Sequence, residues 1–170
     1  MTTARDMIAS HPLQSKIDES LIDACVAACF DCVQASTTCA DACLAEESHA
    51  ELVRCIRLDQ DCADIAGATG QIMARQTESD WTLIRAQVQT CVLACRTSAS
   101  ECEKHAAHHE HCRACAEVGR RCEAACTAVL TATLSMESPV SADTASEQSF
   151  PASDAPSTDG SIGRGSNRAV

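Results

Sequence analysis

Fourteen cysteines dominate this 170-residue sequence, and all of them lie between Cys25 and Cys126. They recur mainly at spacings of three, four or seven residues, which return side chains to the same face of an α-helix. Two runs, beginning at Cys29 and Cys112, share the spacings three, seven and four. We therefore predict thiol stripes that face a common interior. The stripes comprise Cys25, Cys29, Cys32, Cys39 and Cys43; Cys55 and Cys62; Cys91, Cys95 and Cys102; and Cys112, Cys115, Cys122 and Cys126.

This density of thiols indicates metal binding. Cysteine can be a small buried hydrophobe, but a core built largely from it would lose apolar burial and leave voids. Thiolates select Cu(I), zinc or iron–sulfur clusters. Pairs such as Cys25 and Cys29 can place two sulfurs on one ion without a second helix. One monovalent ion per thiolate leaves the core neutral, whereas zinc with four thiolates leaves buried negative charge, so we predict multiple Cu(I) ions.

Two other kinds of metal chemistry are alternatives. General sequestration of zinc or cadmium would use the same soft ligands. The C-x-x-C pairs Cys29/Cys32 and Cys112/Cys115 also occur in redox and iron–sulfur proteins, so an iron–sulfur electron-transfer protein is the second alternative. A thioredoxin-like motif needs a βαβ context, which is missing, and iron–sulfur ligands usually come from tight loops rather than helices. We expect a binding protein and no enzymatic activity.

Histidines gather near two predicted links between helices. In an up-down bundle these links lie at the same end, and imidazole binds copper and zinc. His105 continues the stripe of Cys91 and Ser98 at seven-residue steps, and His111 adjoins Cys112. We predict His105 and His111 as metal ligands that pass ions into the interior. The five histidines at this end are His49, His105, His108, His109 and His111.

The thiol stripes require long helices. No proline occurs between Pro12 and Pro139, and strand-like alternation is missing. Ser15 and Asp18 mark the first start, Ser48 and Glu51 form a capping box, and the cluster 77–80 precedes the third helix. We predict an all-α, antiparallel up-down-up-down four-helix bundle with a cysteine-lined core. The predicted helices cover about 16–46, 49–74, 81–105 and 109–134.

Composition divides the chain into three parts. Residues 1–15 form an N-terminal segment in which 2–10 suit a short helix, and 16–134 form the bundle. Residues 135–170 are rich in serine, proline and glycine and lack cysteine, which predicts a disordered tail. The formal charge of −11 disfavours nucleic acid and anionic membranes as partners. No export signal or long apolar run is recognisable, so we expect a cytoplasmic protein whose cysteines are reduced.

The run HAAHHEHCRACAEVGRRCEAAC at 105–126, with the stripes upstream, resembles the cysteine-rich four-helix-bundle copper storage proteins. The lack of an export signal resembles their cytosolic branch, and the resemblance covers about residues 16–134. It implies a homotetramer whose inward thiolates hold many Cu(I) ions for copper storage, detoxification and homeostasis. A copper chaperone is a candidate partner.

Position by position, the resemblance implies that Cys112, Cys115, Cys122 and Cys126 match the cysteine pattern of the family's fourth helix. His105, His109 and His111 match the family's histidine-rich turn. Three positions depart from the thiol pattern: Gly119, where the repeat would place a cysteine, and Ser36 and Ser98, which lie on otherwise thiol-bearing stripes. We expect these departures to lower the metal capacity locally.

Overall fold

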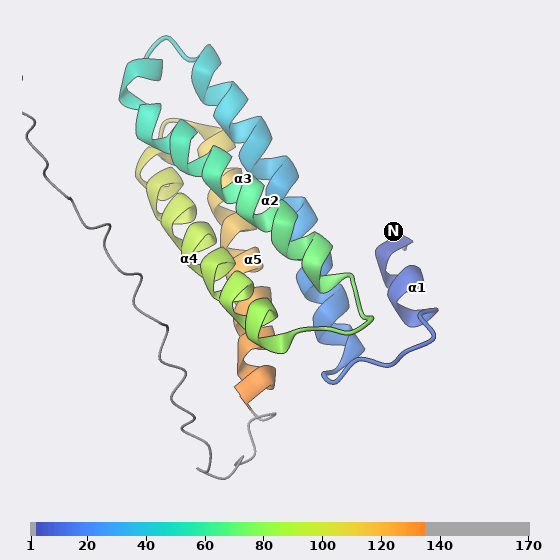
Figure 1. Ribbon diagram of the computed structural model, residues 1–170. Helices are drawn as coiled ribbons and strands as arrows, with labels where there is room; N and C mark the ends of the chain where they lie inside the picture. The colour runs from blue at the N-terminus through green and yellow to red at the C-terminus, as the bar shows by residue number, and fades with distance from the viewer. Residues whose placement is uncertain (1–2, 135–170) are drawn as a thin grey trace, which may run out of the picture. The chain divides into compact units, whose positions relative to one another are not determined.

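The computed structural model describes residues 3–134, and every regular element in that range is helical. Four long helices pack side by side in Figure 1, preceded by the short α1 (Thr3–Ala9). The predicted all-α four-helix bundle and the short N-terminal helix are confirmed. The tail predicted for 135–170 lies outside the described residues. The long helices are α2 (Glu19–Ala45), α3 (Val53–Met73), α4 (Trp81–His105) and α5 (Glu110–Leu134), and the 3₁₀ turn η1 (His49–Glu51) links α2 to α3.

The helices follow one another around the bundle. α2 contacts α3 and α5, and α4 contacts the same two helices. Within residues 3–134, the backbones of the diagonal pairs, α2 with α4 and α3 with α5, do not pack against each other, so these pairs face each other across the core through their side chains. The α2–α3 and α4–α5 links lie at the same end in Figure 1. This end, which carries the five clustered histidines, is called the histidine end below.

Aspartates cap two of the long helices. Asp18 accepts a 2.8 Å hydrogen bond from the backbone N–H of Ser20, so α2 begins at Glu19. The prediction placed this start at residue 16. The hydroxyl of Ser15 instead accepts from the backbone of Ile17 in the turn before the helix. Asp80 accepts from the backbone of the first turn of α4, as the cluster at 77–80 predicted.

The predicted capping box at Ser48 and Glu51 does not form. The Ser48 side chain makes no capping hydrogen bond, and α3 begins only at Val53. The backbone N–H of Glu51 donates to the Ser48 carbonyl at 2.9 Å, and that of Leu52 to the His49 carbonyl at 3.0 Å. These tighter 3₁₀ bonds already satisfy the donors that a capping hydroxyl would have bound.

Aliphatic side chains close the end of the bundle opposite the histidines. Ile22 and Val26 at the start of α2 pack there with Val88 and Val129, and all four are fully buried. At the histidine end, Leu52 is the large aliphatic side chain in the core. The bundle therefore has one apolar end and one polar end, with the cysteines between them.

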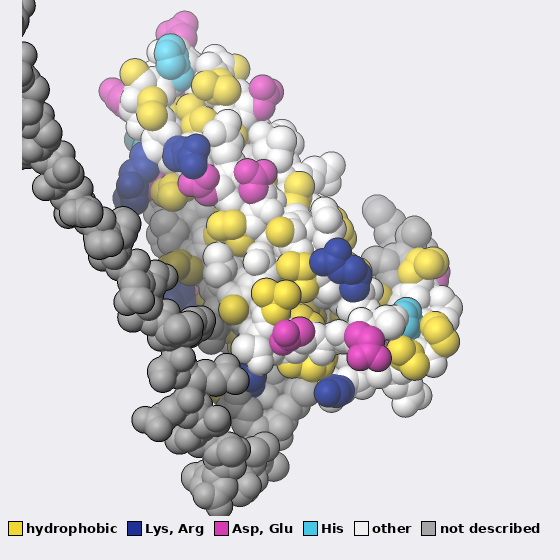
Figure 2. All heavy atoms as spheres, in the orientation of Figure 1, with side chains coloured by type: hydrophobic (Ala, Val, Ile, Leu, Met, Phe, Trp, Pro, Cys, Tyr) yellow, Lys and Arg dark blue, Asp and Glu magenta, His cyan; other side chains and the backbone are white. Residues whose placement is uncertain are grey.

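The outer surface is mixed in character. Hydrophobic side chains lie among charged and other polar ones on the face shown in Figure 2. Leu83, Leu93 and Val53 are among the exposed large hydrophobic residues. None of the helices in the described part of the chain is both long and apolar enough to cross a membrane.

Candidate metal centre

All fourteen predicted cysteines are buried, and none forms a disulfide. Their exposed fractions reach at most 4%, at Cys115. The stripes carry the thiols inward because successive cysteines lie three, four or seven positions apart along each helix. Thirteen of them have another Sγ at 3.5–4.0 Å, and the sulfur of Cys115 lies within 4.8 Å of those of Cys39 and Cys102. The structure therefore brings the predicted thiols together in one core.

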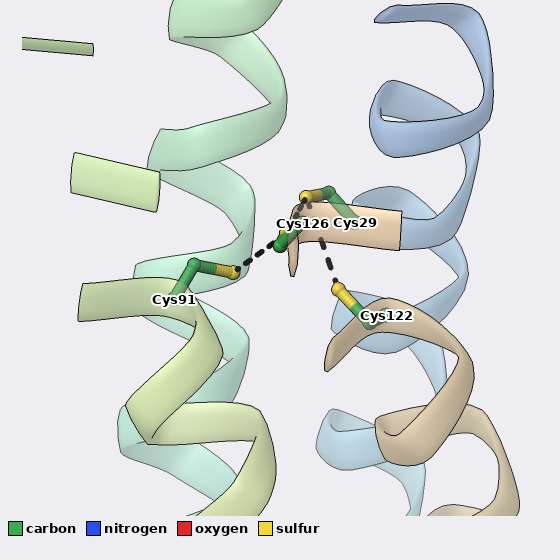
Figure 3. A group of neighbouring side chains, drawn as sticks. All are labelled: Cys29, Cys91, Cys122 and Cys126. Carbon is green, nitrogen blue, oxygen red and sulfur yellow. Dashed lines mark hydrogen bonds between the residues drawn. The ribbon is translucent and has the colours of Figure 1, made fainter. Parts of the chain in front are cut away.

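Eight of these thiols lie toward the aliphatic end and form what we call the aliphatic-end group. In Figure 3, Cys126 points between Cys29 and Cys91, with Sγ–Sγ distances of 4.0 and 3.7 Å, and Cys122 lies 3.9 Å from Cys29. The four sulfurs lie within 4.8 Å of one another. They come from three helices, so only the folded bundle assembles them. The group comprises Cys25, Cys29, Cys32, Cys62, Cys91, Cys95, Cys122 and Cys126.

The same group continues toward the centre of the bundle. The sulfurs of Cys32, Cys62 and Cys95 form a triangle with sides of 3.6, 3.8 and 3.9 Å. Cys95 also lies 3.9 Å from Cys91. These short steps connect the triangle to the four thiols of Figure 3, which gives a continuous path of soft ligands along this half of the core.

The remaining six thiols form the histidine-end group. Cys55 and Cys102 lie 3.5 Å apart, and Cys112 lies 3.9 Å from Cys43 and 4.0 Å from Cys39. The group includes a thiol from each of the four long helices. It comprises Cys39, Cys43, Cys55, Cys102, Cys112 and Cys115.

A polar layer separates the two thiol groups. Ser98 donates a 2.6 Å hydrogen bond to Oδ1 of Asp59, whose side chain is fully buried. The Ser36 hydroxyl lies 3.8 Å from the sulfurs of both Cys32 and Cys115. At these two stripe positions, Ser36 contacts thiols of both groups and Ser98 binds Asp59, so neither position leaves a void.

Asp59 is a member of the site that the sequence analysis missed. Its carboxylate lies within 4.8 Å of the sulfurs of Cys39, Cys102 and Cys115, and burial, assisted by the nearby Cys115 thiolate, raises its pKa to about 7. The available signal was its register. Asp59 lies four residues after Cys55 and three before Cys62, on the thiol face of the helix.

His111 is the histidine that reaches the thiols. Its Nδ1 lies 3.5 Å from the sulfurs of Cys39 and Cys112 and 3.9 Å from that of Cys43. The four ligand atoms lie within 4.8 Å of one another. One imidazole and three thiols form a mixed soft-ligand set that suits copper or zinc.

The other predicted ligand, His105, lies apart from the thiols. Its Nε2 is buried, makes no hydrogen bond, and lies 3.7 Å from Oε1 of Glu101. Glu101 in turn is bound by Lys104 and Arg54. In the described part of the chain, His105 belongs to none of the groups whose ligand atoms converge within 4.8 Å. Its role as a ligand stays a prediction.

His49, His108 and His109 are the other histidines at the histidine end. His109 Nδ1 lies 3.1 Å from Oε1 of Glu46, and its ring centroid lies 5.4 Å from that of His111. His49 and His108 are exposed. Glu46 is a second acidic residue that the sequence analysis missed. It follows the last residue of its helix, a position where the helical period no longer predicts which way a side chain points.

Burial and mutual hydrogen bonding shift the pKa values of the thiols in different directions. Hydrogen bonds with Cys126 and Cys29 lower the pKa of Cys25 to about 5, whereas hydrogen bonding led by Cys122 raises the pKa of Cys29. Burial raises the pKa of Cys43 to about 11. A soft-metal ion that binds these cysteines must displace the protons of the thiols that it binds.

Fold and donors together define the class: a helical bundle whose interior offers soft ligands, with an imidazole at one end. The family model for copper storage proteins matches residues 18–131. This chain belongs to that family, as its resemblance indicated.

Individual relatives agree with this assignment. The copper storage protein Ccsp of Streptomyces lividans, loaded with 10 copper equivalents, is 42% identical, with a TM-score of 0.75 over 76% of this chain and 98% of its own. The Cu(I)-bound copper storage protein BsCsp3 is 36% identical, with a TM-score of 0.57 over 64% and 96% of the two chains. An uncharacterized cysteine-rich protein of Bacillus subtilis, YhjQ, is 37% identical over 64% of this chain and 94% of its own.

Proposed function

We propose that this protein stores Cu(I) by binding many ions through the thiolates of its core, with His111 as a ligand at one end. The observation that carries the proposal is that sulfurs in both thiol groups lie only 3.5–4.0 Å from a neighbouring sulfur. Such distances are shorter than two metal–thiolate bonds of about 2.3 Å laid end to end, the length known for zinc. One ion can therefore bridge two neighbouring sulfurs, and one sulfur can serve two ions.

Charge supports a monovalent cargo. Thiolates in a closed apolar core need one positive charge each, because an uncompensated buried charge is costly. One Cu(I) ion per thiolate satisfies this condition throughout the core. The proposed ligands are the fourteen cysteines, His111 and, as the sequence predicts, His105.

Zinc or cadmium sequestration is the second candidate. Cys29, Cys91, Cys122 and Cys126 favour it, because four converging thiols are also the donor set of a tetrahedral zinc site. Fourteen thiolates would hold only about three or four such ions. An iron–sulfur electron-transfer role receives less support, since the thiols lie on helices instead of a tight loop.

The proposal extends to the setting of the protein. We propose a non-enzymatic, cytoplasmic copper store, supported by a relative from Streptomyces lividans that is described as a cytosolic copper storage protein, 46% identical over 66% of this chain with a TM-score of 0.65. We also propose that the protein assembles into a homo-oligomer, a tetramer by its resemblance to the family. A copper chaperone is the proposed donor.

Competition between metals tests this function. The reduced apoprotein is loaded with Cu(I), Zn(II) or Cd(II) under anaerobic conditions, and the number of ions retained against a chelator is measured. A copper store retains several times more Cu(I) than either divalent ion. Equal or greater retention of zinc or cadmium contradicts the proposal.

A further inference from the structure

The Glu46 carboxylate joins the ends of two helices over the mouth of the bundle. Glu46 is the C-cap residue of α2, and His109 and His111 lie at the start of α5. Oε1 of Glu46 lies 3.1 Å from His109 Nδ1 and 3.2 Å from His111 Nε2. One carboxylate oxygen therefore holds both imidazoles.

The two ring nitrogens of His111 face different partners. Nε2 faces Glu46, while Nδ1 faces the sulfurs of Cys39, Cys43 and Cys112. An ionised carboxylate can only accept hydrogen bonds, so the nitrogen that faces it must carry the proton. In the neutral ring this leaves the Nδ1 lone pair directed at the thiols, which is the arrangement a metal ligand requires.

We propose that Glu46 is a positioning residue for copper binding: it fixes the ring orientation and tautomer of His111 so that Nδ1 is ready to bind an ion held by the histidine-end thiols. The inference rests on the proposed function, because it assigns a role to a partner of one proposed ligand. Glu46 acts through His111 and does not itself bind the ion. Its side chain is 37% exposed, so replacing it leaves the core packing intact.

The tautomer is measured first, on metal-free protein. Long-range nitrogen–proton NMR spectra at pH 8 distinguish the two neutral forms of His111. The wild-type ring is expected in the form protonated at Nε2, and Glu46→Ala is expected to give a mixture. Glu47→Ala, which removes the neighbouring exposed carboxylate, serves as the matched control. A His111 tautomer that is the same in wild type and Glu46→Ala overturns the proposal.

Copper affinity provides the second measurement. With fewer Cu(I) ions than cysteines, competition against bicinchoninate is expected to show the first ions bound about tenfold more weakly in Glu46→Ala, a typical loss when the partner of a metal-binding histidine is removed. Glu46→Gln keeps an accepting oxygen and is expected to restore most of the affinity. Glu47→Ala again serves as the control.

A double variant shows whether Glu46 acts through His111. In the His111→Ala background, Glu46→Ala is expected to cause no further loss of affinity. An equal loss in both backgrounds overturns the proposal, because Glu46 would then act through another group such as His109. The total Cu(I) capacity of the wild type is measured separately. A low capacity contradicts the proposed function, whereas the tautomer of the metal-free protein still decides the role of Glu46.

Discussion

The Ser98 hydroxyl lies 2.6 Å from Oδ1 of Asp59 and donates a hydrogen bond to it, between the two thiol groups of the core. The same Oδ1 atom of Asp59 lies 3.3 Å from the sulfur of Cys102 and 3.7 Å from the sulfur of Cys115. In the described part of the chain, the groups that face this carboxylate are thiols and a hydroxyl, and none of them is a cation. The stability of the apoprotein should therefore depend on the protonation of Asp59.

Replacing Asp59 by asparagine is expected to stabilise the reduced apoprotein at pH 8. Folding raises the pKa of Asp59 from an ordinary value of about 3.9 to about 7, so the folded state holds the proton more tightly. The stability that the protonated carboxyl gives the folded state is present at low pH and is lost as the pH rises from about 4 to about 7. The full difference between the two pKa values corresponds to a loss of at most about 4 kcal/mol in the free energy of unfolding.

Urea unfolding at pH 4.5 and pH 8 measures this effect. The advantage of Asp59→Asn over wild type should be small at pH 4.5 and largest at pH 8. Asp64→Asn, which changes an exposed aspartate on the same helix, is the control and should show no such dependence. An advantage of the Asp59 variant that is the same at both pH values would contradict the assigned pKa.

Gly119 occupies the position where the cysteine repeat would place another thiol, and the structure explains its absence. A Cβ built at Gly119 would lie 3.2 Å from the Cβ of Ala99 on the facing helix. We expect Gly119→Cys to destabilise the apoprotein by about 1–3 kcal/mol through overpacking. Gly119→Cys combined with Ala99→Gly should recover part of this loss. Chemical unfolding of the reduced proteins checks both, and a Gly119→Cys variant as stable as wild type would show that the helices separate freely here.

His111 should matter more than His105 for copper uptake. We expect His111→Ala to slow the binding of the first Cu(I) ions about tenfold, by analogy with the loss of other groups that support metal sites. His105→Ala should have a smaller effect, because its ring lies beside Glu101 instead of the thiols. Stopped-flow loading from a chelated Cu(I) donor measures the rates, with His49→Ala as the exposed control. Unchanged uptake in the variant that lacks both His105 and His111 would leave the histidine end without a role in transfer.

The periodic features of the site could be predicted from the sequence, whereas its local exceptions could not. Spacings of three, four and seven residues determine which face of a helix a side chain occupies, so the burial of Cys29 or Cys122 followed directly. Asp59 shares that register, but an aspartate on a helix is usually exposed, and its burial depends on Ser98 from another helix. His105 is the last residue of α4 and continues the stripe of Cys91 and Ser98, yet its imidazole lies beside Glu101, one turn earlier, which the seven-residue spacing does not predict.

The contacts at the histidine end could not be predicted from the sequence because they depend on loop geometry. The link between α2 and α3 folds as a 3₁₀ turn, which removed the predicted capping box at Ser48. Glu46 reaches His109 and His111 across sixty or more residues of sequence, and no short-range pattern encodes such a contact.

Anaerobic titration of the fully reduced protein with Cu(I), in competition with a chromophoric chelator, tests the central claim most directly. Because the thiolates form connected groups in which each ion can bridge two sulfurs, we expect tight binding to continue to about one ion per cysteine. Saturation at only three or four ions, the number that separate four-thiolate sites would hold, would contradict a copper store.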